Sequence, residues 1–372
     1  MKFKEKKKIL ICSNHAWAIH NFRMPLVKFL RNHGFIVEIL TEYDGYEEKF
    51  ESQVDGIHSL FISRDGINPL IDFFTIVDIY RKLKQINPDY ILLFSIKPVI
   101  YGSIAARILS IRSISMITGL GTGFLLDNWV TKIVKVLYRI ALKDSAAVIF
   151  QNSDDKDLFI AENLLDSSIV KQTPGSGVNL ERFQFRKLNT NSETNFILVA
   201  RMIRDKGIEE YYRAAKILKR EYEDINFRLL GPIGVSNRSS IKRYEIEKWH
   251  RSGIIEYISE SDDIRNYIYD ATCIVLPSYR EGTSRVLLEA ASMGRPLIAT
   301  NVTGCKEIVT DGFNGYLCAP KDPEDLAKKM ECMILASFEE RQRMGDNSRI
   351  KIEKEFDEKI VFNIYLEILN SL

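Results

Sequence analysis

Two carboxylates flank the start of a predicted helix in the second half of the chain. Glu281 precedes Gly282 in a polar loop, and Glu289 stands among apolar residues of the following helix, with seven residues between the two. A carboxylate in apolar surroundings needs a partner, because burying an unpaired charge is costly. The amides of residues 285–287 form a seat for an anion at the helix start. A ligand with a phosphate and several hydroxyls would satisfy these groups. The alternative to a binding site is that one glutamate lies in a solvated loop and the other on the helix surface, since acidic side chains are common near helix starts.

A pair of cations follows the predicted strand that ends at Ala200. Arg201 leaves the carboxyl end of this strand, and Lys206 with Gly207 opens the next helix. The planar fork of an arginine and the point charge of a lysine together suit a diphosphate. The alternative is a set of ordinary loop charges, as we expect for Arg204 between them.

Polar residues also follow two predicted strands in the first half of the chain. His15, Asn21 and Arg23 come after the first strand, and a glycine-rich loop covers residues 118–123. Glycines let a backbone approach a ligand closely. The dinucleotide fingerprint G-x-G-x-x-G is absent, however, because its last glycine is replaced by Phe124. Structural histidines and a plain turn are the alternatives to a binding site here.

The elements that must position these residues alternate between strand and helix. Such alternation predicts an α/β fold with parallel sheets that helices cover on both faces. The pattern breaks at 173–178 and in the polar run 187–194, and restarts at 195–200. We therefore expect two doubly wound, Rossmann-like domains, residues 1–176 and 177–355. Ligands of such sheets bind at the carboxyl ends of the strands, where both sets of loops would face one cleft.

The expected elements of the first half include a loop over residues 14–23 and short helices. The predicted helices in this half span 24–32, 46–53, 68–86, 99–109, 127–143 and 154–163. In the second half, a short helix is expected near residues 306–310, and the chain ends in three helices from residue 323 onward. These ranges follow from apolar periodicity and from capping and turn residues.

The composition restricts the class of protein. The chain has 372 residues and a net charge of +2, so nucleic acid is not an expected partner. Its five cysteines are scattered without a C-x-x-C pair, which indicates reduced thiols in the cytoplasm and no zinc site. No apolar run reaches the roughly 18 residues that span a bilayer, and the run at residues 9–12 is too short for a signal peptide. We expect a cytoplasmic protein with no bound metal.

The segment 97–143 is strongly basic. Within it, the stretch 124–143, which contains the predicted helix 127–143, carries lysines and an arginine among many apolar residues. This composition suits an interfacial helix that docks on anionic lipid, and equally a core-facing amphipathic helix with a solvated basic face. The charged residues of the segment, all but one of them basic, are Lys97, Arg107, Arg112, Asp127, Lys132, Lys135, Arg139 and Lys143.

Through Arg201, Lys206 and the stretch from Glu281 to Glu289, the chain resembles the retaining, nucleotide-sugar-dependent glycosyltransferases of family four, which have the GT-B fold. The resemblance is strongest from residue 196 to 319, where the motifs are Arg-x4-Lys-Gly, Pro-Ser-Tyr-Arg-Glu-Gly, Leu-Leu-Glu-Ala, Gly-Arg-Pro and Asp-Gly-Phe-Asn-Gly. The first half is similar to a narrower branch, the bacterial transferases of surface-glycan assembly. The motifs of that branch are Asn21-Phe-Arg-Met-Pro25, Ser95-Ile-Lys-Pro98, Thr118-Gly-Leu-Gly121 and Gly175-Ser-Gly-Val178.

The resemblance implies a role for each matching position. Arg201 and Lys206 would neutralise the donor diphosphate, Glu281 would contact hydroxyls of the donor sugar, and Glu289 would accept the ribose hydroxyls. It also implies that the last helix, residues 356–372, crosses back to complete the first domain. Further donor-binding positions are Gly282, Thr283, Ser284, Val286, Gly231 and Ile258. The acceptor-side positions are His15, Asn21, Arg23, Lys97, Thr118 and Gly119. Many family members carry a histidine where this chain has Thr118 and Gly119.

The implied reaction is the transfer of a hexose or N-acetylhexosamine from a UDP-sugar to a saccharide on undecaprenyl diphosphate. It would take place at the inner face of the cell membrane, in O-antigen or capsule assembly, with no metal and no other cofactor. Among the named activities of that branch, the chain resembles N-acetylgalactosaminyl transfer most. Two alternatives are a sugar-nucleotide 2-epimerase on the same fold and a non-catalytic subunit of a glycan-assembly complex. The intact set of Arg201, Lys206, Glu281 and Glu289 speaks against the latter.

Overall fold

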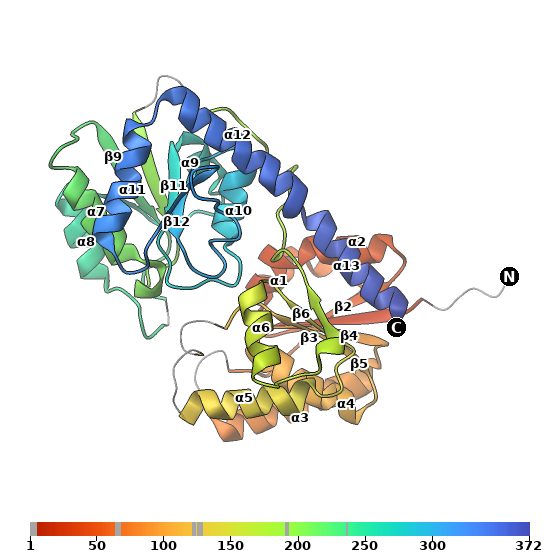
Figure 1. The fold of residues 1–372 in the computed structure, drawn as a ribbon. Coiled ribbons are helices and arrows are strands. Elements are labelled where there is room, and N and C mark those ends of the chain that lie inside the picture. Colours follow the sequence, from red (N-terminus) through yellow and green to blue (C-terminus); the bar gives the residue numbers. More distant parts are fainter. Residues whose placement is uncertain (1–5, 64–67, 121–123, 125–128, 190–192, 236) are drawn as a thin grey trace. The chain divides into compact units, whose positions relative to one another are not determined.

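The computed structural model describes residues 6–63, 68–120, 124, 129–189, 193–235 and 237–372. The chain divides into two compact units, which are described separately (Figure 1). Unit 1 comprises Met1–Thr173 and Phe362–Leu372, and unit 2 comprises Pro174–Val361.

Unit 1 is built on a parallel sheet with the strand order β3-β2-β1-β4-β5-β6-β7. The central strands β1 and β4 are almost wholly apolar and buried, as expected for a sheet covered on both faces. The strands are β1 (Lys8–Cys12), β2 (Ile36–Thr41), β3 (Gly56–Ser59), β4 (Tyr90–Phe94), β5 (Arg112–Ile117), β6 (Ala147–Phe150) and β7 (Val170–Gln172).

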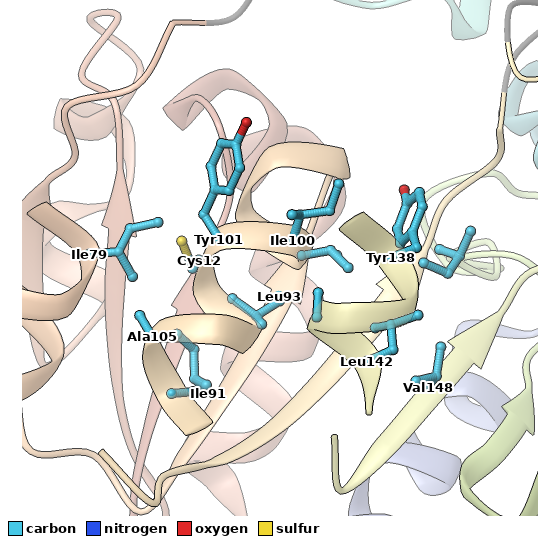
Figure 2. Packing of buried hydrophobic residues seen from close by; sticks show 14 of the residues in the cluster. Cys12, Ile79, Ile91, Leu93, Ile100, Tyr101, Ala105, Tyr138, Leu142 and Val148 are labelled. Atoms are coloured by element: carbon cyan, nitrogen blue, oxygen red, sulfur yellow. The ribbon is translucent and has the colours of Figure 1, made fainter. Parts of the chain in front are cut away.

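Helices pack on this sheet, and the hydrophobic core of unit 1 lies between them and the strands. Figure 2 shows one core layer, in which Ile79 of α3, Ala105 of α4 and Leu142 of α5 surround Ile91 and Leu93 of β4. The helices are α1 (Ala16–Phe22), α2 (Met24–Asn32), α3 (Pro69–Ile86), α4 (Ser103–Ile108), α5 (Trp129–Leu142) and α6 (Ser153–Ala161), with the helical turns η1 (Glu47–Lys49), η2 (Glu51–Gln53), η3 (Pro98–Gly102) and η5 (Ser167–Ile169).

Two sequence-based expectations for unit 1 are wrong. Residues 14–23, predicted as a loop, contain helix α1; its N-cap, His15, makes no side-chain capping hydrogen bond, so the usual start signal is missing. Residues 46–53 form the two short turns η1 and η2 in place of one helix. The glycine loop 118–123 and the helix expected over 127–143 extend into residues 121–123 and 125–128, which lie outside the described residues.

Unit 2 repeats the architecture with a parallel sheet of order β10-β9-β8-β11-β12-β13. The expectation of a short helix near residues 306–310 is wrong, because residues 303–308 form consecutive turns. The strands are β8 (Thr194–Val199), β9 (Ile225–Leu230), β10 (Glu256–Ile258), β11 (Cys273–Leu276), β12 (Leu297–Thr300) and β13 (Gly315–Cys318). The helices are η6 (Arg204–Lys206), α7 (Ile208–Leu218), α8 (Arg243–Arg251), α9 (Arg265–Asp270), α10 (Arg285–Ser292), α11 (Pro323–Leu335) and α12 (Phe338–Glu355).

Each sheet has one point at which the strand order reverses. In unit 1 it lies between β1 and β4, and in unit 2 between β8 and β11. In doubly wound sheets, ligands bind at the carboxyl ends of the strands beside this point. The prediction of an α/β fold with two doubly wound sheets is confirmed, and the topology indicates where to look for a site in each unit.

The last helix, α13 (Glu358–Ser371), belongs to both units. Its first residues lie in unit 2, where the Glu358 amide donates to the Val178 carbonyl at 3.1 Å. Its later residues lie in unit 1, where Phe362 packs on Phe29 with ring centroids 5.3 Å apart. The Tyr365 hydroxyl reaches the Met116 sulfur at 3.4 Å in the interior of unit 1.

Candidate functional site

The switch point of unit 2 brings a lysine and a glutamate together. Lys206 ends the turn after β8, Glu281 lies in the loop after β11, and the Lys206 Nζ is 2.5 Å from the Glu281 Oε1. Gly207 lets the turn after β8 pack closely against the loop after β11. It has a φ of +69°, and a Cβ there would lie 2.1 Å from the Pro277 carbonyl oxygen. The side chains of Lys206 and Glu281 are 20% and 13% exposed, so the ion pair is largely shielded from water.

Glu281 is held in place by its own loop and by the next one. The hydroxyl of Ser278, which is fully buried, donates to the same Oε1 at 2.6 Å. The Glu281 amide donates to the Thr303 carbonyl at 3.0 Å. Gly304 has a φ of +82°, and a Cβ there would lie 2.6 Å from the Glu281 backbone. These contacts fix the position of the Glu281 carboxylate at the switch point.

Neither Ser278 nor Thr303 was identified from the sequence. Ser278 follows a proline directly after a buried strand, and this position at a strand's carboxyl end is the signal that could have identified it. The turn at Thr303 had no comparable signal, because the segment beyond it resembled a helix.

Glu289 lies on α10 and is only 8% exposed. Both the Nε and the Nη2 of Arg285 lie 3.1 Å from its Oε1, so the partner that a buried carboxylate requires is supplied one turn away. Burial raises the pKa of Glu289, although the cations of Arg285 and Arg182 act in the opposite direction.

The start of α10 offers fewer amides than the sequence suggested. The Ser284 hydroxyl accepts from the Leu287 amide at 3.4 Å, and the Ser284 amide donates to the Gly304 carbonyl at 3.0 Å. Ser284 and Leu287 are therefore used within the fold, which corrects the expected anion seat and the expected role of the Ser284 amide. Val286, at the second position of α10, stays a candidate. In the loop before α10, the Thr283 hydroxyl donates to the Gly282 carbonyl at 2.9 Å. Gly175, from an earlier segment, approaches this loop so closely that a Cβ on it would lie 2.7 Å from the Thr283 side chain.

The two arginines near the switch point differ in their surroundings. Arg201 is exposed, and within the described part of the chain its guanidinium has no hydrogen bond or ion pair. Arg204 instead pairs with Glu209 and, at 3.4 Å, with Glu245. Arg204 is thus an ordinary loop charge, as expected, whereas ligand binding by Arg201 stays a prediction.

Gly231 follows β9, and Ile258 is the last residue of the neighbouring strand β10. The Gly231 amide donates to the Ile258 carbonyl at 3.2 Å, and the Tyr257 hydroxyl donates to the Gly231 carbonyl at 2.9 Å. A Cβ on Gly231 would lie 2.0 Å from the Ala200 carbonyl oxygen, so this loop touches the residue before Arg201. The carboxyl ends of β8, β9, β10 and β11 thus carry all the expected donor-side residues of one unit.

The acceptor-side residues of unit 1 follow the adjacent strands β1, β4 and β5. His15 Nδ1 lies 2.8 Å from the Asn14 Oδ1, which also accepts from the Ser95 hydroxyl at 3.0 Å, so the loops after β1 and β4 are joined. Lys97 forms a 2.8 Å ion pair with Asp72. Thr118 and Gly119 follow β5 directly.

Asn21 and Arg23 lie differently from the loop position that was expected. Asn21 is on α1, and its amide donates to the Trp17 carbonyl at 3.0 Å. Arg23 is 9% exposed, with its guanidinium 4.0 Å from the centre of the Phe94 ring. Arg23 therefore packs in unit 1, whereas the Asn21 amide is bonded within its own helix.

Among the described residues, no group of three or more His, Cys, Asp or Glu side chains is arranged to hold a metal ion. No described helix combines the length and the apolar character needed to cross a bilayer.

Two family models match the chain. The model of glycosyl transferases group 1 matches residues 181–351, and the glycosyl transferase 4-like model matches residues 8–152. The first match contains Arg201, Lys206, Glu281 and Glu289, and the second contains the loops after β1, β4 and β5.

Individual proteins are similar over most of the chain. The N,N'-diacetylbacillosaminyl-diphospho-undecaprenol alpha-1,3-N-acetylgalactosaminyltransferase of Campylobacter jejuni is 26% identical, over 96% of this chain and 97% of its own. The UDP-Gal:alpha-D-GlcNAc-diphosphoundecaprenol alpha-1,3-galactosyltransferase of Escherichia coli is 26% identical over 72% of both chains. The crystal structure of Anabaena HepE in complex with UDP-glucose has a TM-score of 0.80 at 16% identity, covering 98% of this chain and 100% of that one, and shares the fold.

Proposed function

This chain belongs to the glycosyltransferases of the GT-B fold, and from that premise we propose that it transfers a hexose or N-acetylhexosamine from a UDP-sugar to a saccharide on undecaprenyl diphosphate. Both family models describe glycosyl transferases, which supports transfer over the epimerase and the non-catalytic alternatives. The two relatives name a lipid diphosphate in their acceptors, which supports an acceptor of that kind in surface-glycan assembly.

The observation that carries the proposal is the Lys206–Glu281 pair at the switch point of unit 2, with the exposed Arg201 on the same edge of the sheet. A sugar nucleotide carries hydroxyls next to a diphosphate, so it needs a carboxylate and cations close together. Lys206 and Arg201 would neutralise the diphosphate and the charge that develops on it as the sugar leaves. Glu281 would accept hydrogen bonds from the sugar hydroxyls.

The remaining donor contacts follow the order of the strands. Glu289 would accept the ribose hydroxyls, and Gly231 with Ile258 would border the uracil. We expect Gly282, Thr283 and the Val286 amide to border the sugar and phosphate. We expect transfer with retention of the anomeric configuration, as in the family that the chain resembles. We also expect that no metal ion is needed, since the two cations supply the charge stabilisation that leaving-group departure requires.

The acceptor would meet unit 1. His15, Lys97, Thr118 and Gly119 follow strands at its switch point, where a doubly wound sheet binds its ligand. An acceptor on undecaprenyl diphosphate would bring the protein to the inner face of the cell membrane as a peripheral, cytoplasmic enzyme. Nucleic acid is not an expected partner.

A transfer assay tests the proposal. The protein is incubated with a panel of UDP-sugars and with undecaprenyl-diphosphate-linked saccharides in membranes, with EDTA in a parallel series. We expect UDP release coupled to a longer glycan, unchanged by EDTA and lost in Lys206→Ala. An incubation with donor alone serves as the control. An epimerised sugar nucleotide there, with no transfer to any acceptor, would establish the epimerase in place of the transferase.

A further inference from the structure

Helix α5 of unit 1 presents an apolar stripe to solvent. Trp129, Ile133, Val136 and Ile140 recur at intervals of four, three and four residues, which places them along one face of the helix. They are between 45% and 70% exposed. A continuous exposed apolar stripe of this kind marks a surface that binds another protein or a membrane.

The core of unit 1 does not need this stripe. The opposite face of α5 carries Tyr138, Ala141 and Leu142, which are buried, and Figure 2 shows Tyr138 and Leu142 in the core layer. The helix therefore has two apolar faces. The core-facing role expected from the sequence holds for one face, and the other face is left exposed.

The first turns of α3 carry three more exposed apolar side chains. Leu70, Phe73 and Phe74 are 73%, 59% and 58% exposed. Both α3 and α5 contact η3 and contribute to the same core cluster, which places them on the same side of the sheet (Figure 1). Seven exposed apolar side chains, three of them aromatic, thus lie on two helices of one face.

The charges beside the stripe indicate the chemistry of the partner. Helix α5 contains no acidic residue, whereas Lys132 and Arg139 are exposed along it and Lys143 follows its end. Contact with a second copy through this helix would bring cations against cations. Anionic phospholipid headgroups complement these charges, while the acyl region accepts the apolar side chains.

We infer that the stripe of α5, together with Leu70, Phe73 and Phe74 of α3, is the surface on which this protein docks on an anionic membrane. The inference rests on the proposed function, because a membrane-borne acceptor gives the docking its purpose. It assigns the contact to named residues of unit 1, outside the loops at the switch point.

Vesicle co-sedimentation of the full chain tests the inference. The vesicles contain phosphatidylcholine with or without phosphatidylglycerol. We expect binding to the anionic vesicles that weakens as salt increases. The double variant Ile133→Ser, Ile140→Ser should bind at least about tenfold more weakly, and Lys132→Glu severalfold more weakly. Leu335→Ser is the matched control, because Leu335 lies on α11 of unit 2 and is 70% exposed, as Trp129 is.

Equal vesicle binding by the double variant and the wild type would overturn the inference. So would a wild-type dimer in light scattering that the double variant abolishes while neither protein binds vesicles, since a second copy would then cover the face. UDP binding by calorimetry and transfer to a short-chain soluble acceptor separate this inference from the proposed function. Both should persist in the double variant, whereas failure of the proposed function removes transfer from the wild type and leaves vesicle binding in place.

Discussion

The ion pair between Lys206 and Glu281 predicts that removing the glutamate charge strengthens the binding of UDP. The diphosphate of a donor would compete with Glu281 for the Lys206 ammonium, which lies 2.5 Å from the carboxylate. In Glu281→Gln the side chain keeps its shape, and its amide oxygen can still accept from the Ser278 hydroxyl. The lysine then has one competing anion fewer.

The size of the effect follows from the burial of the pair. A hydrogen bond to a charged group contributes about 1.5–3 kcal/mol. Because the two side chains retain 20% and 13% exposure, and the lysine can contact both anions in part, we expect about 1 kcal/mol of this to be released. UDP should therefore bind about fivefold more tightly to Glu281→Gln. Transfer should fall by about 10²-fold or more, because the sugar loses a charged partner.

Isothermal titration calorimetry with UDP measures the first effect, and kcat/KM for transfer measures the second. Lys206→Ala should weaken UDP binding at least about tenfold. In the Lys206→Ala background, Glu281→Gln should leave the affinity for UDP unchanged, because no ammonium remains to be released. Arg204→Ala, which removes an arginine already paired with Glu209 and Glu245, is the control.

Two results would refute the reasoning. Weaker UDP binding by Glu281→Gln would mean that the carboxylate does not compete with the diphosphate. An equal gain in affinity with and without Lys206 would mean that the glutamate acts through some other group.

Three further predictions concern the same unit. Ser278→Ala should lower kcat/KM about tenfold while UDP affinity stays within about twofold, because the hydroxyl orients Glu281 without touching the nucleotide; an equal loss in both measurements would contradict this. Because burial raises the pKa of Glu289, stability from this group is complete below its ordinary pKa of 4.5 and is lost as the pH rises through the higher folded-state pKa. The stability of Glu289→Gln relative to wild type, from urea unfolding, should therefore increase from pH 4 towards pH 7, and a pH-independent difference would contradict the cause. Gly207→Ala should lower the free energy of unfolding by more than about 2 kcal/mol, whereas Gly253→Ala, with a similar φ of +73° and no neighbour within 4 Å, should cost only about 1 kcal/mol. Equal losses would show that the backbone angle alone, without the loop contact, is responsible.

The sequence indicated the expected donor-side residues individually, but it did not predict the pairing of Lys206 with Glu281. Lys206 and Glu281 each follow a buried strand, which was visible from apolar runs and helix-capping residues. Their contact depends on β8 and β11 being neighbours in the sheet, and no local pattern specifies that order. The sequence alone therefore predicts separate ligand groups for the two side chains and no ion pair between them.

Local signals also explain the errors in the elements. Helix α3 was predicted correctly from its start because Asn68 accepts hydrogen bonds from the amides of Leu70 and Ile71. Helix α1 has no such cap and was assigned to a loop. Helix α5 left two alternatives open because apolar residues on both of its faces satisfy the same helical period, and only the packing shows which face is buried.

The division of α13 between the units has a consequence for synthesis. The sheet of unit 1 is translated before unit 2, whereas Phe362, Tyr365 and Leu369, which are buried in unit 1, follow unit 2 in the chain. The whole of unit 2 is translated in the interval. The Phe29 and Phe94 rings therefore lack their partners Phe362 and Tyr365 until unit 2 has been translated. Unit 1 thus receives part of its buried side chains only after the whole of unit 2 has been made.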